Sequence, residues 1–128
     1  VGSEMCIRDR ITVVASLAGY RGLPTAAAYG ATKAALINMC EALRPELDKH
    51  GVVLQLINPG FVKTPLTDKN DFSMPFLMPV EDAVEAIMRG LSGRTFEIAF
   101  PGRFAFLMKI LRSLPYRLFF ALTARLIK

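Results

Sequence analysis

Tyr29 and Lys33 are four residues apart in a stretch whose composition predicts a helix. On a helix, this spacing places both side chains on one face, one turn apart. A lysine ammonium at that distance favours the phenolate form of tyrosine, so Tyr29 is a candidate proton donor and acceptor near neutral pH. Ser16 lies thirteen residues earlier, at the end of the apolar run Ile11–Ala15. Open α/β sheets carry their sites where a strand ends in a loop, so Ser16 is a candidate partner of Tyr29.

Three groups of residues in this chain resemble the active-site segments of the classical short-chain dehydrogenase/reductase family. They are Ser16 with the Ala18-Gly19 pair and Pro24, the run Tyr29-Gly30-Ala31-Thr32-Lys33, and the later run Asn58-Pro59-Gly60-Phe61-Val62-Lys63-Thr64. A lone Tyr-x-x-x-Lys motif is a weak signal, whereas three matched groups in the family's order are a strong one. The resemblance covers roughly residues 10 to 100.

The resemblance implies an oxidoreductase that transfers hydride between NAD or NADP and a carbonyl or alcohol. In that family's pattern, Tyr29 donates the proton, Ser16 hydrogen-bonds the reacting oxygen, and Lys33 supports Tyr29 and binds the nicotinamide ribose. The turn that follows the second strand would hold the nicotinamide carboxamide. Its expected cofactor-binding residues are Pro59, Gly60, Val62 and Thr64, together with Tyr29 and Lys33.

The pattern of apolar and small residues predicts alternating strands and helices. Strands are expected at Ile11–Ala15, Val52–Ile57 and Thr95–Phe100, and helices at 26–49 and Val80–Arg89. The first two strands read as buried on both faces, as in a parallel sheet. Residues 63–78 contain prolines, and their apolar residues follow neither a helix nor a strand period. This pattern predicts a loop over a site. The expected fold is α/β: the C-terminal half of a doubly wound, Rossmann-like parallel sheet with a helical C-terminal extension.

Three segments are expected along the chain. Residues 1–10 resemble no part of the family and are interpreted as a non-native N-terminal scar. Residues 11–102 form the partial Rossmann-like domain, and residues 103–128 form a basic, apolar helical tail divided at Pro115. The glycine-rich loop that would bind the cofactor's pyrophosphate is not in this sequence. The chain alone is therefore expected to be an inactive fragment that binds the cofactor weakly or not at all.

The tail also differs from the rest of the chain in charge. Residues 1–100 hold ten Lys/Arg and eleven Asp/Glu, whereas residues 101–128 hold six Lys/Arg and no acid. Three interpretations fit this tail: it packs on the body or on a partner subunit of a homo-oligomer, it lies on an anionic membrane surface, or it covers an apolar, lipid-like substrate. The basic residues are too localised for a nucleic-acid-binding body.

Other features narrow the class of protein. Two cysteines make no disulfide framework, no Cys/His cluster suggests a metal, and no run is apolar enough to span a membrane, so a cytoplasmic protein is expected. One alternative is a non-catalytic relative that serves as a dimerisation or membrane-surface binding module. Another keeps the family but changes the reaction to that of an epimerase or dehydratase.

Overall fold

The computed structural model describes residues 9–70 and 73–127. Its strands and longer helices are β1 (Arg10–Val14), α1 (Ala27–Lys49), β2 (Val53–Pro59), α2 (Val80–Leu91), β3 (Glu97–Phe100), α3 (Gly102–Ser113) and α4 (Tyr116–Thr123). The short 3-10 turns along the chain are η2 (Leu17–Gly19), η3 (Thr67–Lys69) and η4 (Ala124–Leu126). Most of the expected scar lies outside the described residues, but Arg10 is already part of β1.

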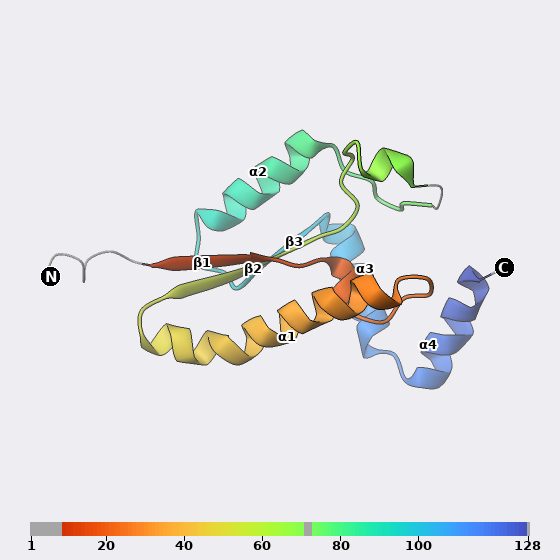
Figure 1. The fold of residues 1–128 in the computed structure, drawn as a ribbon, viewed down its shortest axis with the longest axis horizontal. Helices are drawn as coiled ribbons and strands as arrows, with labels where there is room; N and C mark the ends of the chain where they lie inside the picture. The colour runs from red at the N-terminus through yellow and green to blue at the C-terminus, as the bar shows by residue number, and fades with distance from the viewer. Residues whose placement is uncertain (1–8, 71–72, 128) are drawn as a thin grey trace, which may run out of the picture.

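The three strands form one parallel sheet in the order β1-β2-β3. Val14 of β1 pairs with Ile57 of β2, and Ile57 pairs with Ile98 of β3, so the strands end at the same edge. Figure 1 shows α1 on one side of this sheet and α2 on the other. The expected α/β fold with a parallel, doubly wound sheet and a helical extension is confirmed.

β2 is the central strand, and its alternating side chains join two separate cores. Leu54 and Leu56 pack in the cluster that contains residues of α1 and α3. Ile57 points to the other face and packs with Ala83 of α2 and Ile98 of β3. This alternation follows from the two-residue period of a strand, and it explains why residues 52–57 are apolar at every position except Gln55.

β1 differs from the expectation of a strand buried on both faces. Its Ile11 and Val14 are 44% and 54% exposed, and of its five residues only Val13 is partly buried. The expectation was wrong because β1 is an edge strand among the described residues, so one row of its backbone groups has no neighbouring strand. A β-branched apolar run shows that a residue can be buried, whereas actual burial depends on which elements lie beside it.

Helix α1 ends in a turn that contains a glycine. Gly51 has a φ of 74°, a left-handed conformation that costs glycine little. The Gly51 N–H donates to the Asp48 carbonyl at 3.1 Å, and the Val52 N–H donates to the Leu47 carbonyl at 2.9 Å. These two bonds form a Schellman motif, which satisfies the last carbonyls of the helix and turns the chain into β2.

The tail is joined to the body by apolar packing and by a loop arginine. Phe104 and Met108 of α3 are buried in the same core as α1 and β2. Arg21, in the loop before α1, donates to the carbonyls of Arg112 and Leu114 at 2.8 Å each, and its guanidinium lies 4.1 Å from the ring centroid of Phe119 on α4. A loop arginine therefore caps the end of α3 and holds α4.

Candidate active site

Ser16 lies directly after β1 and begins the turn η2. It is 7% exposed, and its Oγ accepts a hydrogen bond from the Ala18 N–H at 3.1 Å. The same hydroxyl donates to the Pro59 carbonyl at 3.4 Å. Two of the expected site residues, Ser16 and Pro59, are thus in contact at the carboxyl ends of neighbouring strands.

The η2 turn packs directly on the first turns of α1. A Cβ atom added to Gly19 would lie 2.8 Å from the backbone carbon of Lys33 and 2.9 Å from the nitrogen of Ala34. The Ala18 carbonyl oxygen lies 3.3 Å from the place where a Cβ of Gly30 would be. Small residues on both sides allow the two backbones to touch, so the segment that carries Ser16 lies against the segment that carries Tyr29 and Lys33.

Tyr29 is the third residue of α1, and Lys33 follows one turn later. The Lys33 Nζ lies 5.5 Å from the centroid of the Tyr29 ring, so the expected juxtaposition on one helix face is present. Tyr29 is 55% exposed, and none of the described residues hydrogen-bonds to its hydroxyl. The phenol is therefore accessible from solvent, beside a cation.

Val62 follows the Pro-Gly turn and forms a parallel bridge with Met78. The bridge uses the Lys63 N–H, which donates to the Met78 carbonyl at 2.8 Å, and the Met78 N–H, which donates to the Phe61 carbonyl at 2.9 Å. In this pattern the Val62 backbone groups point away from Met78. The Val62 carbonyl accepts from Thr67 Oγ1 at 3.0 Å, while its N–H donates to none of the described residues.

Gly60 and Thr64 are also brought to this edge of the sheet. The Gly60 N–H donates to the Phe100 carbonyl at 2.8 Å, and a Cβ on Gly60 would lie 2.7 Å from the Phe104 ring. Thr64 Oγ1 accepts from the Thr67 N–H at 3.3 Å and lines a pocket of ≈ 250 Å³ between the loop and the start of α2. Its hydroxyl therefore also stabilises the η3 turn, a role not expected from the sequence.

Sequence reasoning missed a cluster of polar side chains beneath these residues. Glu97 of β3 accepts hydrogen bonds from the Tyr20 hydroxyl and from Asn58 Nδ2, the latter at 2.8 Å, and forms an ion pair with Lys109 at 2.8 Å. A single acid in an otherwise apolar strand was the available signal. Its partners lie 39 and 77 residues away in the sequence, so no local spacing reveals them.

The environment of this cluster shifts two pKa values in opposite directions. Burial alone would raise the pKa of the Glu97 carboxyl, but hydrogen bonds from Lys109, Tyr20 and Asn58 and the charge of Lys109 outweigh it, so its pKa lies below the ordinary value. Burial raises the pKa of the Tyr20 phenol, and the bond to the Glu97 carboxylate raises it further. Glu97 is thus held ionised and Tyr20 is held protonated.

We predict that the contribution of Glu97 to the unfolding free energy depends on pH. Folding lowers the pKa of Glu97, so its stabilising effect is complete above the ordinary pKa of about 4.3 and is lost as the pH falls through the folded-state value. Glutamine at position 97 does not titrate. The difference in unfolding free energy between wild type and Glu97→Gln should therefore shrink between about pH 7 and about pH 3 in urea denaturation. A difference that is constant over this range would contradict the assignment.

Comparison with known proteins identifies the family. The model of the short chain dehydrogenase family matches residues 6–73, a span that includes Ser16, Tyr29, Lys33 and the Pro59–Gly60 turn. This chain belongs to the short chain dehydrogenase family. The geometry described above thus places family-matched residues from three segments at one edge of the sheet.

Oxidoreductases are among the proteins that this chain resembles. An oxidoreductase of Myxococcus xanthus is 44% identical over 119 residues, covering 93% of this chain and 47% of the relative. The ketoacyl reductase HetN of Nostoc is 33% identical over 93 residues, covering 70% of this chain and 32% of the relative. A short chain dehydrogenase from Burkholderia cenocepacia, solved with NADP, is 28% identical with a TM-score of 0.75, covering 99% of this chain and 52% of that one. The chain therefore spans about half the length, or less, of these members.

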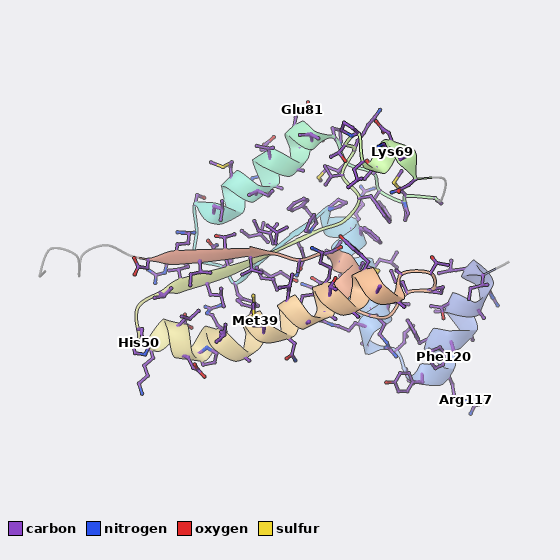
Figure 2. The ribbon with its side chains drawn as sticks, in the orientation of Figure 1. Met39, His50, Lys69, Glu81, Arg117 and Phe120 are labelled. Carbon is purple, nitrogen blue, oxygen red and sulfur yellow. The ribbon has the colours of Figure 1, made fainter. Side chains whose placement is uncertain are left out.

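Three further features concern other kinds of site. His50 lies at the C-terminal end of α1, and Figure 2 shows it at the opposite end of that helix from η2. Residues 9–70 and 73–127 contain no group of three or more potential metal ligands. In the same residues, no helix combines the length and the hydropathy that a bilayer crossing needs.

Proposed function

We propose that this chain forms the proton-transfer end of an NAD(P)-dependent oxidoreductase that acts on a carbonyl or an alcohol. The observation that carries the proposal is the backbone contact between η2 and α1. That contact sets the segment with the buried hydroxyl of Ser16 against the helix that bears Tyr29 and Lys33. A hydroxyl donor, an accessible phenol and a cation at a strand end are the groups that carbonyl reduction needs.

The three side chains have distinct roles in this proposal. Tyr29 donates a proton to the carbonyl oxygen during reduction and takes it back during oxidation. Ser16, held by Ala18 and Pro59, shares the same oxygen and stabilises the negative charge that develops on it. Lys33 favours the phenolate that remains after transfer, because its ammonium lies on the same helix face as the ring.

The loop after β2 fits the nicotinamide end of the cofactor. The Val62 N–H points away from its bridge partner and is available to an amide carbonyl, and Thr64 offers a hydroxyl proton beside it. Pro59 and Gly60 keep this turn close to Ser16. A bound nicotinamide supplies or accepts the hydride, and either NAD or NADP satisfies the proposal because they share this end. Lys33 is assigned the adjoining ribose.

An apolar, acyl-type substrate is the class that the neighbouring surface favours. The Phe104 ring stacks on Phe61 at 5.9 Å and on Phe76 at 5.7 Å between centroids, directly beside Gly60. Phe76 and Leu66 of the same loop are 45% and 75% exposed. Such a wall provides apolar area near the reacting carbonyl, whereas it offers few partners to a strongly polar substrate.

The surface of α4 leads us to propose a homo-oligomer. Tyr116, Leu118 and Phe120 are exposed, and Figure 2 shows Phe120 and Arg117 on this helix, away from α2. A second subunit would cover these rings and aliphatic chains. Contact with an anionic membrane surface is the alternative, and it is also the basis of the non-catalytic binding-module function.

A reduction assay on the complete gene product tests the proposed function. We expect oxidation of NADPH or NADH, followed by absorbance, in the presence of a 3-oxoacyl thioester or a hydrophobic ketone. The 128-residue chain assayed alone is expected to bind either dinucleotide weakly, because its sequence lacks a glycine-rich phosphate loop. A complete product that binds neither dinucleotide and reduces no carbonyl would favour the binding-module alternative.

A further inference from the structure

A single carboxylate joins three segments beneath the candidate site. Glu97 Oε2 accepts hydrogen bonds from the Tyr20 hydroxyl and from Asn58 Nδ2, while Glu97 Oε1 lies 2.8 Å from Lys109 Nζ. Tyr20 ends the η2 turn, Asn58 lies at the end of β2, and Lys109 belongs to α3. Charge-assisted hydrogen bonds are the strong ones, so this carboxylate restrains all three segments.

The orientation of the Asn58 amide depends on Glu97. Asn58 is fully buried, and its Oδ1 is without a hydrogen-bond partner among the described residues. Rotating the amide by half a turn would place this oxygen against the Glu97 carboxylate and lose the hydrogen bond that Nδ2 donates to it. The orientation of the Asn58 amide is therefore set by the hydrogen bond that its Nδ2 donates, not by its oxygen.

The same two segments determine the position of Ser16. The η2 turn that begins at Ser16 closes with the Tyr20 N–H donating to the Leu17 carbonyl at 3.1 Å. On the other side, the Ser16 hydroxyl donates to the carbonyl of Pro59, the residue after Asn58. Both segments that hold the Ser16 hydroxyl are thus tied, through Tyr20 and Asn58, to one oxygen of Glu97.

We propose that Glu97 is a positioning residue that holds the Ser16 hydroxyl in its catalytic orientation, with Lys109 fixing the carboxylate from α3. This inference rests on the proposed function, because it concerns the orientation of a residue that the function assigns to the reacting oxygen. Glu97 itself lies beneath the turn and acts only through Tyr20 and Asn58. It also links the tail helix α3 to the site, because Lys109 of that helix acts on the Ser16 turn through the Glu97 carboxylate.

The substitution Glu97→Gln tests this arrangement with little change in volume. If the glutamine amide keeps its oxygen toward Tyr20 and Asn58, its N–H₂ group meets the Lys109 ammonium. If it turns, its N–H₂ group faces the Tyr20 hydroxyl and the Asn58 amide, and both must reorient to accept. Either way the wild-type arrangement of hydrogen bonds around position 97 is lost. The matched control is Glu85→Gln, which removes an exposed pair with Arg89 on α2.

Wild type and each variant should be compared as the complete gene product, by hydrogen exchange and by steady-state kinetics. For Glu97→Gln we expect faster amide exchange confined to residues 16–20 and 58–61, and a kcat about 10- to 100-fold lower with an unchanged KM for the dinucleotide. Glu85→Gln should change neither quantity. Tyr20→Phe, which removes one arm and keeps the ring, should shift both quantities in the same direction and serves if Glu97→Gln does not fold.

Two results would overturn the positioning role. One is exchange that rises throughout the chain, because this indicates a general loss of stability. The other is a kcat equal to that of the Glu85→Gln control in an active enzyme. A wild-type product without reductase activity would refute the proposed function instead, and the local exchange pattern would still decide whether Glu97 orders the Ser16 turn.

Discussion

Replacing Tyr29 by phenylalanine is expected to lower the turnover number for carbonyl reduction by about 10²- to 10⁴-fold, the usual contribution of a positioned general acid. The substitution removes the hydroxyl and keeps the ring against which Lys33 lies. No described residue hydrogen-bonds to that hydroxyl and the side chain is more than half exposed, so the free energy of unfolding should change by less than about 0.5 kcal/mol. Kinetics and urea denaturation of the complete gene product measure both effects.

Tyr116→Phe is the matched control for this experiment. Tyr116 is an exposed tyrosine on α4, and phenylalanine there retains the ring that lies 5.2 Å from the Arg21 guanidinium. Loss of a phenolic hydroxyl that the proposed function does not use should leave turnover unchanged. Equal turnover in the two variants would mean that Tyr29 donates no proton, and the proposed function would have to be abandoned in favour of a binding module.

The helical part of the site could be predicted because its signals are local. Tyr29 and Lys33 share a face owing to the period of the helix, and Gly51 ends α1 because glycine accepts a positive φ at low cost. The strand β2 could also be predicted, since a long apolar run is needed where both faces of a parallel sheet are covered. Each of these features depends on residues within one or two turns of each other.

The contacts that hold the site together depend on residues far apart in the chain. Arg21 lies about 90 residues before the carbonyls that it caps, and Glu97 gathers side chains from η2, β2 and α3. A hydrophobic pattern shows Arg21 and Lys109 only as charged residues of a solvated surface. The exposure of β1 could not be read from its residues for the same reason, because burial is a property of neighbours and not of a strand's own composition.

Gly19→Ala is expected to have the second-largest effect, because Gly19 packs the turn that follows Ser16 against α1, the helix that bears Tyr29. The new methyl group would lie 2.8 Å from the backbone carbon of Lys33 and 2.9 Å from the backbone nitrogen of Ala34, closer than real Cβ atoms approach. The backbone of α1 cannot give way as a flexible side chain would, so the η2 turn must move. Overpacking of this kind costs about 1–3 kcal/mol of unfolding free energy.

Movement of the turn should also separate Ser16 from Tyr29, the two groups that we propose to act on the carbonyl oxygen. A displacement of about 1 Å between reacting groups can cost about 100-fold in rate, so we expect turnover to fall by that order in Gly19→Ala. Gly22→Ala is the control, because a Cβ at Gly22 meets no atom within 4 Å. Equal stability and equal turnover in the two alanine variants would show that η2 is free to shift on α1, and the pairing of Ser16 with Tyr29 would then need another cause.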